Sequence, residues 1–288
     1  MSQSNIGPRF VLTLACPDRI AIVASVANFL VEHHCNILDS AQFGDVSNGT
    51  FFMRVCFAGD SDTRMDRLAR GFEPIAARFA MRWRLYDLAV KPRVLIMVSK
   101  FGHCLNDLLY RYRVEAIPIE IRAIVSNHRD FAQLAAAQGI PFHYLPIEPA
   151  TRRRQEERLY ELFESEGCEL LVLARYMQIL SSDFCARVPE RAINIHHSFL
   201  PSFQGARPYE QAHDRGVKLI GATAHYVTEE LDEGPIIEQD VVRVDHAMSV
   251  EKCVAAGREI ECSVLARAVT WHAERRILMN GRRSIVFR

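Results

Sequence analysis

The chain has 288 residues, of which 49% are hydrophobic and 24% are charged, so it can bury a substantial core. This composition excludes an intrinsically disordered chain, and the length predicts one large or two ordinary domains. Lys plus Arg and Asp plus Glu each number 35, and the resulting zero net charge argues against a dedicated nucleic-acid-binding protein.

Targeting and metal motifs are sparse. No apolar run reaches the roughly 18 residues that a membrane span needs, and no basic-then-apolar signal stretch opens the chain. The eight cysteines contain no C-x-x-C pair, which argues against a zinc ribbon. We therefore expect a cytoplasmic protein with reduced thiols and with neither a membrane nor a nucleic-acid partner.

The first part of the chain predicts a small antiparallel sheet with two helices. Alternating, β-prone segments predict strands over residues 9–15, 36–43, 50–57 and 81–89. Apolar spacing predicts helices over 19–33, with Asp18 as the N-cap, and over 62–79. The order β-α-β-β-α-β is that of a ferredoxin-like domain, which we assign to residues 1–89.

From Pro92 onward the pattern changes to α/β. The continuous apolar run over 94–98 predicts a strand buried on both faces, and further strands are predicted over 119–125, 142–146 and 169–173. These strands alternate with helices over 104–112, 131–138 and 155–166. This alternation is typical of a doubly wound, mostly parallel sheet, which we assign to residues 90–288. Three later elements complete the domain: an antiparallel extension (218–227 and 235–244), a long helix (249–274) and an edge strand (285–287).

Three polar residues form the candidate catalytic group. A short strand ending near Pro201 places Asn194 and His196 on one face, because side chains two apart point the same way. Asn can donate to a developing oxyanion, His can move a proton near neutral pH, and Asp232 can orient that His. Each residue alone is more often a satisfied polar group at a strand end, but the three together with their flanking motifs favour a site.

The second domain shows neither a nucleotide-binding motif nor metal-ligand spacing near the candidate catalytic group. The turn after the first apolar strand of the second domain reads Ser99-Lys100-Phe101-Gly102-His103, without a phosphate-loop or G-x-G-x-x-G pattern. No His or carboxylate pair near the candidate group has the i, i+4 spacing of helix-borne metal ligands. We expect neither a nucleotide cofactor nor a metal.

Four segments resemble the 10-formyltetrahydrofolate-dependent formyltransferase superfamily: 194–201 (NIHHSFLP), 205–209 (GARPY), 221–227 (GATAHYV) and 231–237 (LDEGPII). Within that superfamily the chain is most similar to the formyltetrahydrofolate deformylases. His197 stands where the purine-pathway transferases have Pro, and residues 100–105 replace their Gly-rich phosphate turn. In addition, an N-terminal module resembling an ACT domain precedes the catalytic part.

The resemblance implies hydrolysis of 10-formyltetrahydrofolate to formate and tetrahydrofolate. The family's catalytic Asn, His and Asp fall on Asn194, His196 and Asp232, and folate is the substrate rather than a cofactor. Residues 173–180 resemble the pterin-binding loop, and by the same resemblance residues 225–232 form the other wall of the site. The implied substrate-binding residues are Met177, Ile179, Leu180, His197 and Val227. His103 is a candidate for a residue that supports these substrate-binding residues without contacting the substrate.

ACT modules imply a homo-oligomer. This copy reads Ile20-Ala21 where the ACT pattern has Pro-Gly, and the added methyl group favours an architectural role over amino-acid sensing. Two alternative functions remain open at this point. One is a formyltransferase that passes the formyl group to an amine such as glycinamide ribonucleotide, and the other is a non-enzymatic amino-acid sensor.

Overall fold

The chain folds into two compact units in a computed structural model that describes residues 7–148, 150–201 and 208–288. The first unit comprises the chain up to Lys91 with Glu274–Asn280 and Ile285–Arg288, and the second comprises Pro92–Ala273 and Gly281–Ser284. This division differs from the predicted 1–89 and 90–288, since two C-terminal segments group with the first unit.

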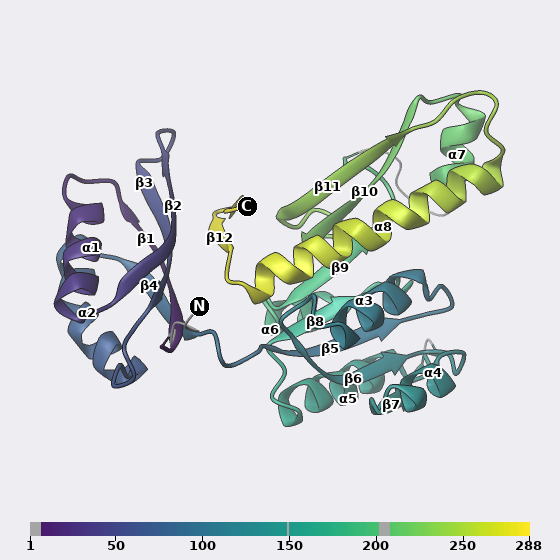
Figure 1. The fold of residues 1–288 in the computed structure, drawn as a ribbon. Helices are drawn as coiled ribbons and strands as arrows, with labels where there is room; N and C mark the ends of the chain where they lie inside the picture. Colours follow the sequence, from purple (N-terminus) through teal and green to yellow (C-terminus); the bar gives the residue numbers. More distant parts are fainter. Residues whose placement is uncertain (1–6, 149, 202–207) are drawn as a thin grey trace, which may run out of the picture. The chain divides into compact units, whose positions relative to one another are not determined.

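The first unit has the predicted ferredoxin-like order (Figure 1). Its elements are β1 (Arg9–Pro17), α1 (Ile22–Glu32), β2 (Asn36–Asp45), β3 (Thr50–Ala58), α2 (Met65–Phe79) and β4 (Arg82–Asp87). The antiparallel sheet has the order β2-β3-β1-β4, and both helices cover one of its faces. Leu12, Leu14, Val26, Phe29 and Phe72 are part of the core between them.

The C-terminal segments belong to the first unit because they pack against the opposite face of this sheet. Phe287, Leu278 and Ile285 pack against Ala15 and Phe52 in a second small apolar cluster. Polar contacts hold the same region: Asn280 donates to Asp45 at 2.6 Å, and the buried Arg54 donates to the Glu274 carbonyl at 2.9 Å. Alternating side chains on β1 and β3 therefore supply two cores, one to each face of the sheet.

The start of α1 corrects one prediction. Asp18 is not the N-cap: its backbone N–H donates to the Gly49 carbonyl at 2.8 Å, which keeps Asp18 with the strand pair. The N-cap is Ala21, which has a left-handed φ of 75° and no side-chain capping bond. The methyl group at this position therefore sits in a conformation that glycine adopts more easily.

The second unit is built on one twisted sheet of order β11-β10-β9-β8-β5-β6-β7. Strands β7, β6, β5, β8 and β9 run parallel, and β10 and β11 extend the sheet in antiparallel fashion, as predicted. The strands are β5 (Arg93–Val98), β6 (Glu120–Ser126), β7 (Phe142–Tyr144), β8 (Leu170–Leu173), β9 (Ala192–His196), β10 (Leu219–Tyr226) and β11 (Ile236–Arg243).

Helices cover both faces of this sheet. They are α3 (His103–Arg113), α4 (Ala132–Ala137), α5 (Arg152–Ser165), α6 (Ser182–Arg187), α7 (Pro208–Asp214) and α8 (Val250–Ala273), of which α6 and α7 were not predicted. Leu159 and Phe163 of α5 and Phe184 of α6 pack on one face, and α8 lies on the other with α3 and α7 (Figure 1).

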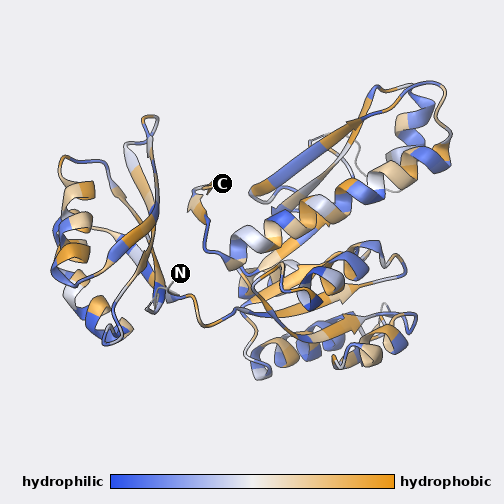
Figure 2. Cartoon of the chain, viewed as in Figure 1, coloured by the Kyte–Doolittle hydropathy of each residue, from blue (hydrophilic) through white to orange (hydrophobic). Residues whose placement is uncertain are grey.

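Burial on both faces accounts for the composition of the parallel strands. Every residue of β8 is buried, as is every residue of β5 after Arg93, and Figure 2 shows these strands as predominantly hydrophobic. The C-terminal segment also forms β12 (Ile277–Asn280) and β13 (Arg283–Val286), so the predicted edge strand at 285–287 pairs only with β12. Among the described helices, none is both long and apolar enough to cross a bilayer.

We expect Ala21→Gly to stabilise the first unit by about 1 kcal/mol, because it relieves the left-handed strain of an alanine. The matched control is Ala24→Gly, the same change on an exposed position inside α1, which should destabilise by about 1 kcal/mol. Hydrogen exchange of the α1 amides in urea measures both changes. Equal destabilisation by the two variants would contradict this account of the helix start.

Candidate active site

The sheet topology brings the three candidate catalytic residues to one place. Asn194 and His196 lie two apart at the carboxyl end of β9, where ligand sites of parallel α/β sheets form. The neighbouring β10 places His225 directly opposite Asn194 in the antiparallel register. The chain leaves β10 after Tyr226 and returns at Pro235, and Asp232 lies on the intervening loop.

The return loop depends on close backbone contact. The Tyr226 amide donates to the Pro235 carbonyl at 3.0 Å. A Cβ on Gly234 would lie 1.7 Å from the Tyr226 carbonyl oxygen, so only glycine fits there. Asp232 itself has a left-handed φ of 57°, a conformation that is rare outside glycine and often found at functional sites.

A cavity of about 450 Å³ collects all eight residues that the sequence predicted for the site. Its lining includes Asn194, His196, His197, Asp232, Met177, Ile179, Leu180 and Val227. The lining also includes Arg175, Tyr176 and His225, which belong to the predicted wall segments 173–180 and 225–232 but had no predicted role of their own. Residues 205–207 of the segment 205–209 that carries part of the family resemblance lie outside the described residues.

Asp232 joins two imidazole rings. Its Oδ2 lies 3.1 Å from His196 Nδ1, and its Oδ1 lies 3.5 Å from His225 Nε2. Burial opposes the charged carboxylate, but the hydrogen bond from His196 outweighs it and holds the pKa of Asp232 below its usual range. Asp232 is therefore anionic near neutral pH and accepts the proton on His196 Nδ1.

This arrangement leaves one nitrogen of His196 for chemistry. His196 is 5% exposed, and its Nε2 is buried without a hydrogen-bond partner among the residues that the structure describes. Buried polar atoms in folded proteins nearly always have a partner. Because the ring lines the cavity, its Nε2 is the atom that can exchange a proton with a bound molecule.

His225 orients the amide of Asn194. His225 Nδ1 lies 2.9 Å from the Tyr226 carbonyl, which can only accept, so the proton of the neutral ring is on Nδ1. The other nitrogen, Nε2, then accepts from Asn194 Nδ2 at 3.2 Å. One N–H of Asn194 is thus engaged, and the second N–H remains available to a ligand oxygen.

The apolar wall of the cavity is a loop held by α5. Met177 and Ile179 are 45% and 58% exposed, so their side chains offer apolar surface to a ligand. Arg152 donates to the Ile179 carbonyl, and Gln155 donates to Tyr176 Oη at 3.1 Å. Glu156 accepts from the Ser181 amide at 2.8 Å. These bonds preform the loop.

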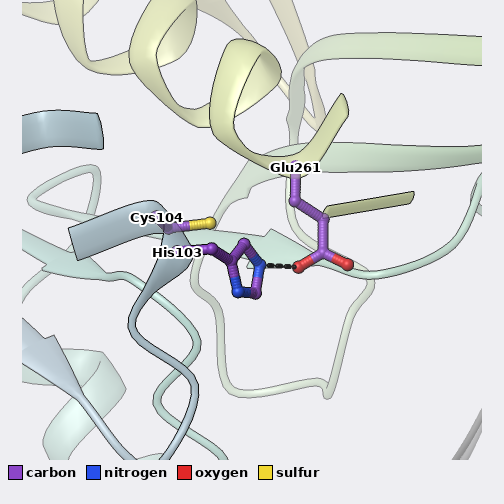
Figure 3. Close-up of side chains that lie close together, drawn as sticks. All are labelled: His103, Cys104 and Glu261. Carbon is purple, nitrogen blue, oxygen red and sulfur yellow. Dashed lines mark hydrogen bonds and ion pairs between the residues drawn. The ribbon is translucent and has the colours of Figure 1, made fainter. Parts of the chain in front are cut away.

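A second polar cluster lies behind the catalytic group. His103, Cys104 and Glu261 bring possible metal-ligand atoms within 4.8 Å of one another (Figure 3). Glu261 Oε2 accepts from His103 Nε2 at 2.8 Å and lies 3.2 Å from Arg175 Nε, while Tyr209 Oη donates to Oε1 at 2.6 Å.

The chemistry of this cluster does not suit a metal ion. The positively charged guanidinium of Arg175 already lies beside the Glu261 oxygen that would bind the metal, and it would repel a metal cation there. A hydrogen bond with Cys262 and burial both raise the pKa of the Cys104 thiol, which disfavours the thiolate that a metal requires. We therefore interpret the cluster as a buried hydrogen-bond network centred on Glu261.

His197, the first residue after β9, lies beside this network. Burial, together with the charges of Arg175 and His196, lowers its pKa to about 4. Its ring centroid lies 5.3 Å from that of His196 and 6.4 Å from that of Tyr209. His197 is therefore a neutral partner beside His196 at physiological pH.

We predict that the His197 ring titrates near the lowered pKa of about 4, which NMR of the ring nitrogens measures. Because the unfolded chain binds this proton at a pH of about 6.5, the free energy of unfolding should fall as the pH drops from 6.5 toward 4. His197→Asn should show a shallower loss over the same range. A His197 titration at or above its ordinary pKa would contradict the assigned environment.

Comparisons with known proteins identify the family of the chain. The formyl transferase family model matches residues 92–269. A formyltetrahydrofolate deformylase of Corynebacterium sp. (strain P-1) is 52% identical over 97% of this chain and 98% of its own length. The Escherichia coli (strain K12) formyltetrahydrofolate deformylase is 39% identical over 96% of this chain and 98% of its own length.

Solved structures give the same result. The formyltetrahydrofolate deformylase of Burkholderia mallei superposes with a TM-score of 0.93 at 53% identity, covering 98% of this chain and 100% of its own. A glycinamide ribonucleotide transformylase of Symbiobacterium toebii reaches a TM-score of 0.65 at 30% identity and covers 71% of this chain and 98% of its own. The chain belongs to the formyltetrahydrofolate deformylase family.

Proposed function

We infer that this chain hydrolyses 10-formyltetrahydrofolate to formate and tetrahydrofolate, the activity that its relatives' name describes. The observation that carries the inference is the orientation of the His196 ring. Its Nδ1 contacts Asp232, and its Nε2 has no hydrogen-bond partner among the described residues and is on a ring that lines the cavity. Asn194, which His225 orients, lies in the same lining. Together these groups supply an oxyanion donor and a proton carrier beside one carbonyl carbon.

The chain's own groups account for each step of the reaction. Water attacks the formyl carbon while His196 Nε2 takes a proton from the water. The anionic Asp232 stabilises the imidazolium that forms. The remaining N–H of Asn194 donates to the oxyanion, and losing one such donor typically costs about 3–4 kcal/mol of barrier. His196 then returns the proton to the leaving nitrogen as the C–N bond breaks.

The apolar loop suits the flat ring system of a pterin. Met177, Ile179, Leu180 and Val227 line one wall of the cavity, where exposed backbone groups of the loop can meet the polar ring edge. Because α5 fixes this loop through side-chain hydrogen bonds, little ordering is required when the ring binds. The same wall would place the formyl-bearing nitrogen near His196.

Release of formate without any added amine separates hydrolysis from transfer. We expect full turnover with 10-formyltetrahydrofolate and water alone, because the turn at residues 99–103 has a single glycine where the transferases have a Gly-rich phosphate turn. The assay measures formate and tetrahydrofolate together. Formate that appears only when glycinamide ribonucleotide is present would favour the transferase, and no turnover under either condition would favour a non-enzymatic sensor.

Asp232→Asn should lower kcat at least about a hundredfold while the fold persists, because the neutral amide can neither stabilise an imidazolium nor favour the required tautomer of His196. The control is Glu233→Gln, which removes a neighbouring carboxylate whose side chain is 58% exposed. Steady-state kinetics and circular dichroism measure turnover and folding. Activity of Asp232→Asn within tenfold of the wild type would contradict the proton path.

The first unit supports a further part of the proposal, namely that it is an ACT-type domain through which copies of the chain associate. β2 is an edge strand, and it leaves Ile37, Leu38 and Phe43 between 39% and 47% exposed. An exposed edge with apolar side chains favours pairing with another strand. The Ala21 methyl at the start of α1 supports an architectural role over binding of an amino acid.

Sedimentation velocity tests this association. We expect Phe43→Lys to shift the chain toward smaller species, whereas Val90→Lys, which changes a 65% exposed residue outside the sheet, should leave the oligomer intact. Identical sedimentation of both variants and the wild type would exclude the β2 edge.

The cellular setting follows from the chemistry. We propose that the enzyme acts in the cytoplasm and releases formate from the one-carbon carrier for purine biosynthesis. Loss of the gene should then create a purine requirement that added formate relieves.

A further inference from the structure

Arg175 is a buried cation beside the reacting groups that the mechanism above does not use. It lies two residues after the end of β8, is 8% exposed, and lines the cavity together with Asn194 and His196. Of the described residues, it is the only Arg or Lys in that lining. Its backbone has a left-handed φ of 65°, a strained conformation that is unusual for a long side chain and common at functional sites.

One edge of the guanidinium faces an anion and another edge is free. Nε lies 3.2 Å from Oε2 of Glu261, which is 1% exposed, and the guanidinium carbon lies 5.8 Å from the Phe101 ring centroid. Nε forms this ion pair without hydrogen-bond geometry, and Nη1 is buried and has no hydrogen-bond partner in the described part of the chain. Unpaired donors on a buried cation are costly, so a guanidinium kept in this state indicates an anionic ligand.

Glu261 is equipped to hold that cation in place. Burial opposes its charged form, but the hydrogen bonds from His103 and Tyr209 and the charge of Arg175 together lower its pKa. His103 comes from the start of α3, Tyr209 from α7 and Glu261 from the middle of α8, so three helices converge on this one carboxylate. The network therefore orients the free edge of Arg175.

The neighbours of Arg175 indicate a small carboxylate. The planar guanidinium matches a carboxylate through parallel N–H donors. His197 is neutral at physiological pH and can donate without a competing charge. Asp232 is anionic, so it repels a carboxylate from the position where the formyl carbon reacts.

We propose that Arg175 forms a subsite for formate, the carboxylate product, next to the catalytic groups. The proposal rests on the proposed hydrolysis, since cleavage of the formyl C–N bond by water produces formate and an N–H group inside this cavity. Formate then moves from the anionic Asp232 toward the free edge of Arg175. Product formate therefore binds where the donors of Arg175 are unpaired.

Direct binding tests the subsite without any turnover. We expect line broadening of ¹³C-formate by the wild-type chain in the absence of folate, and at least about tenfold weaker binding by Arg175→Met. The matched control is Arg191→Met, which also removes an arginine that contacts a glutamate, Glu164, and lies over a phenylalanine ring, Phe163, outside the cavity lining. Arg191→Met should bind formate as the wild type does.

Product inhibition provides the second measurement. Sodium formate should inhibit the wild-type enzyme with an inhibition constant that rises at least about tenfold in Arg175→Met, while sodium chloride at equal ionic strength has no such effect. Arg175→Lys keeps the charge but loses the planar fork, so its inhibition constant for formate should lie between those of the wild type and Arg175→Met. The Lys variant replaces the Met variant if the latter fails to fold.

The outcomes separate the two proposals. Unchanged formate binding in both Arg175 variants, or no binding by the wild type, would overturn the subsite even if hydrolysis is observed. Loss of binding in the Arg175 variants alone supports the subsite. A chain that binds formate through Arg175 but releases none from 10-formyltetrahydrofolate would instead contradict the proposed hydrolysis.

Discussion

The structure of the site depends on one half-buried carboxylate between two imidazoles. Asp232 lies between His196 and His225, and the hydrogen bond from His196 keeps it charged despite its partial burial. Because the carboxylate is fixed, the proton of His196 is on Nδ1, and Nε2 is left to act in the cavity. His225 in turn fixes the amide of Asn194, so the oxyanion donor and the proton carrier are oriented through the same few contacts.

The fold supplies this geometry through strand register. Asn194 and His196 share a face because they are two apart on β9, and the antiparallel β10 places His225 opposite Asn194. The return loop brings Asp232 to the same edge only because Gly234 permits close approach to the Tyr226 carbonyl. A buried parallel sheet with helices on both faces keeps the strand ends rigid, and α5 does the same for the apolar loop.

Local pattern was enough to predict most elements, and resemblance was enough to predict which residues share the cavity. The mainly apolar segments 94–98 and 169–173 predicted strands that are buried on both faces, as β5 and β8 are. The Asp18 cap was wrong because a long-range backbone bond to Gly49 holds that residue in the sheet. The short helices α6 and α7 were missed because segments of six and seven residues carry almost no periodic signal.

The unpredicted site residues depend on contacts between distant segments. His225 owes its role to the register of β9 with β10, and Arg175 owes its setting to Glu261, which is 86 positions away on α8. Glu261 is one of several charged residues of α8, so the sequence of the helix did not single it out, although the fold buries it almost completely. A buried carboxylate is rarely without partners, so its burial in the structure is what indicates the polar network.

The central claim is that the carboxamide of Asn194 and Nε2 of His196 act on one formyl group. The most direct measurement is a crystal structure with a folate whose formyl-bearing linkage resists hydrolysis. The account predicts Asn194 Nδ2 within about 3.2 Å of the formyl oxygen, and His196 Nε2 at a similar distance from a water or from the linkage atom that replaces the leaving nitrogen. A formyl group bound away from both atoms, with His196 Nε2 still unpartnered, would contradict it.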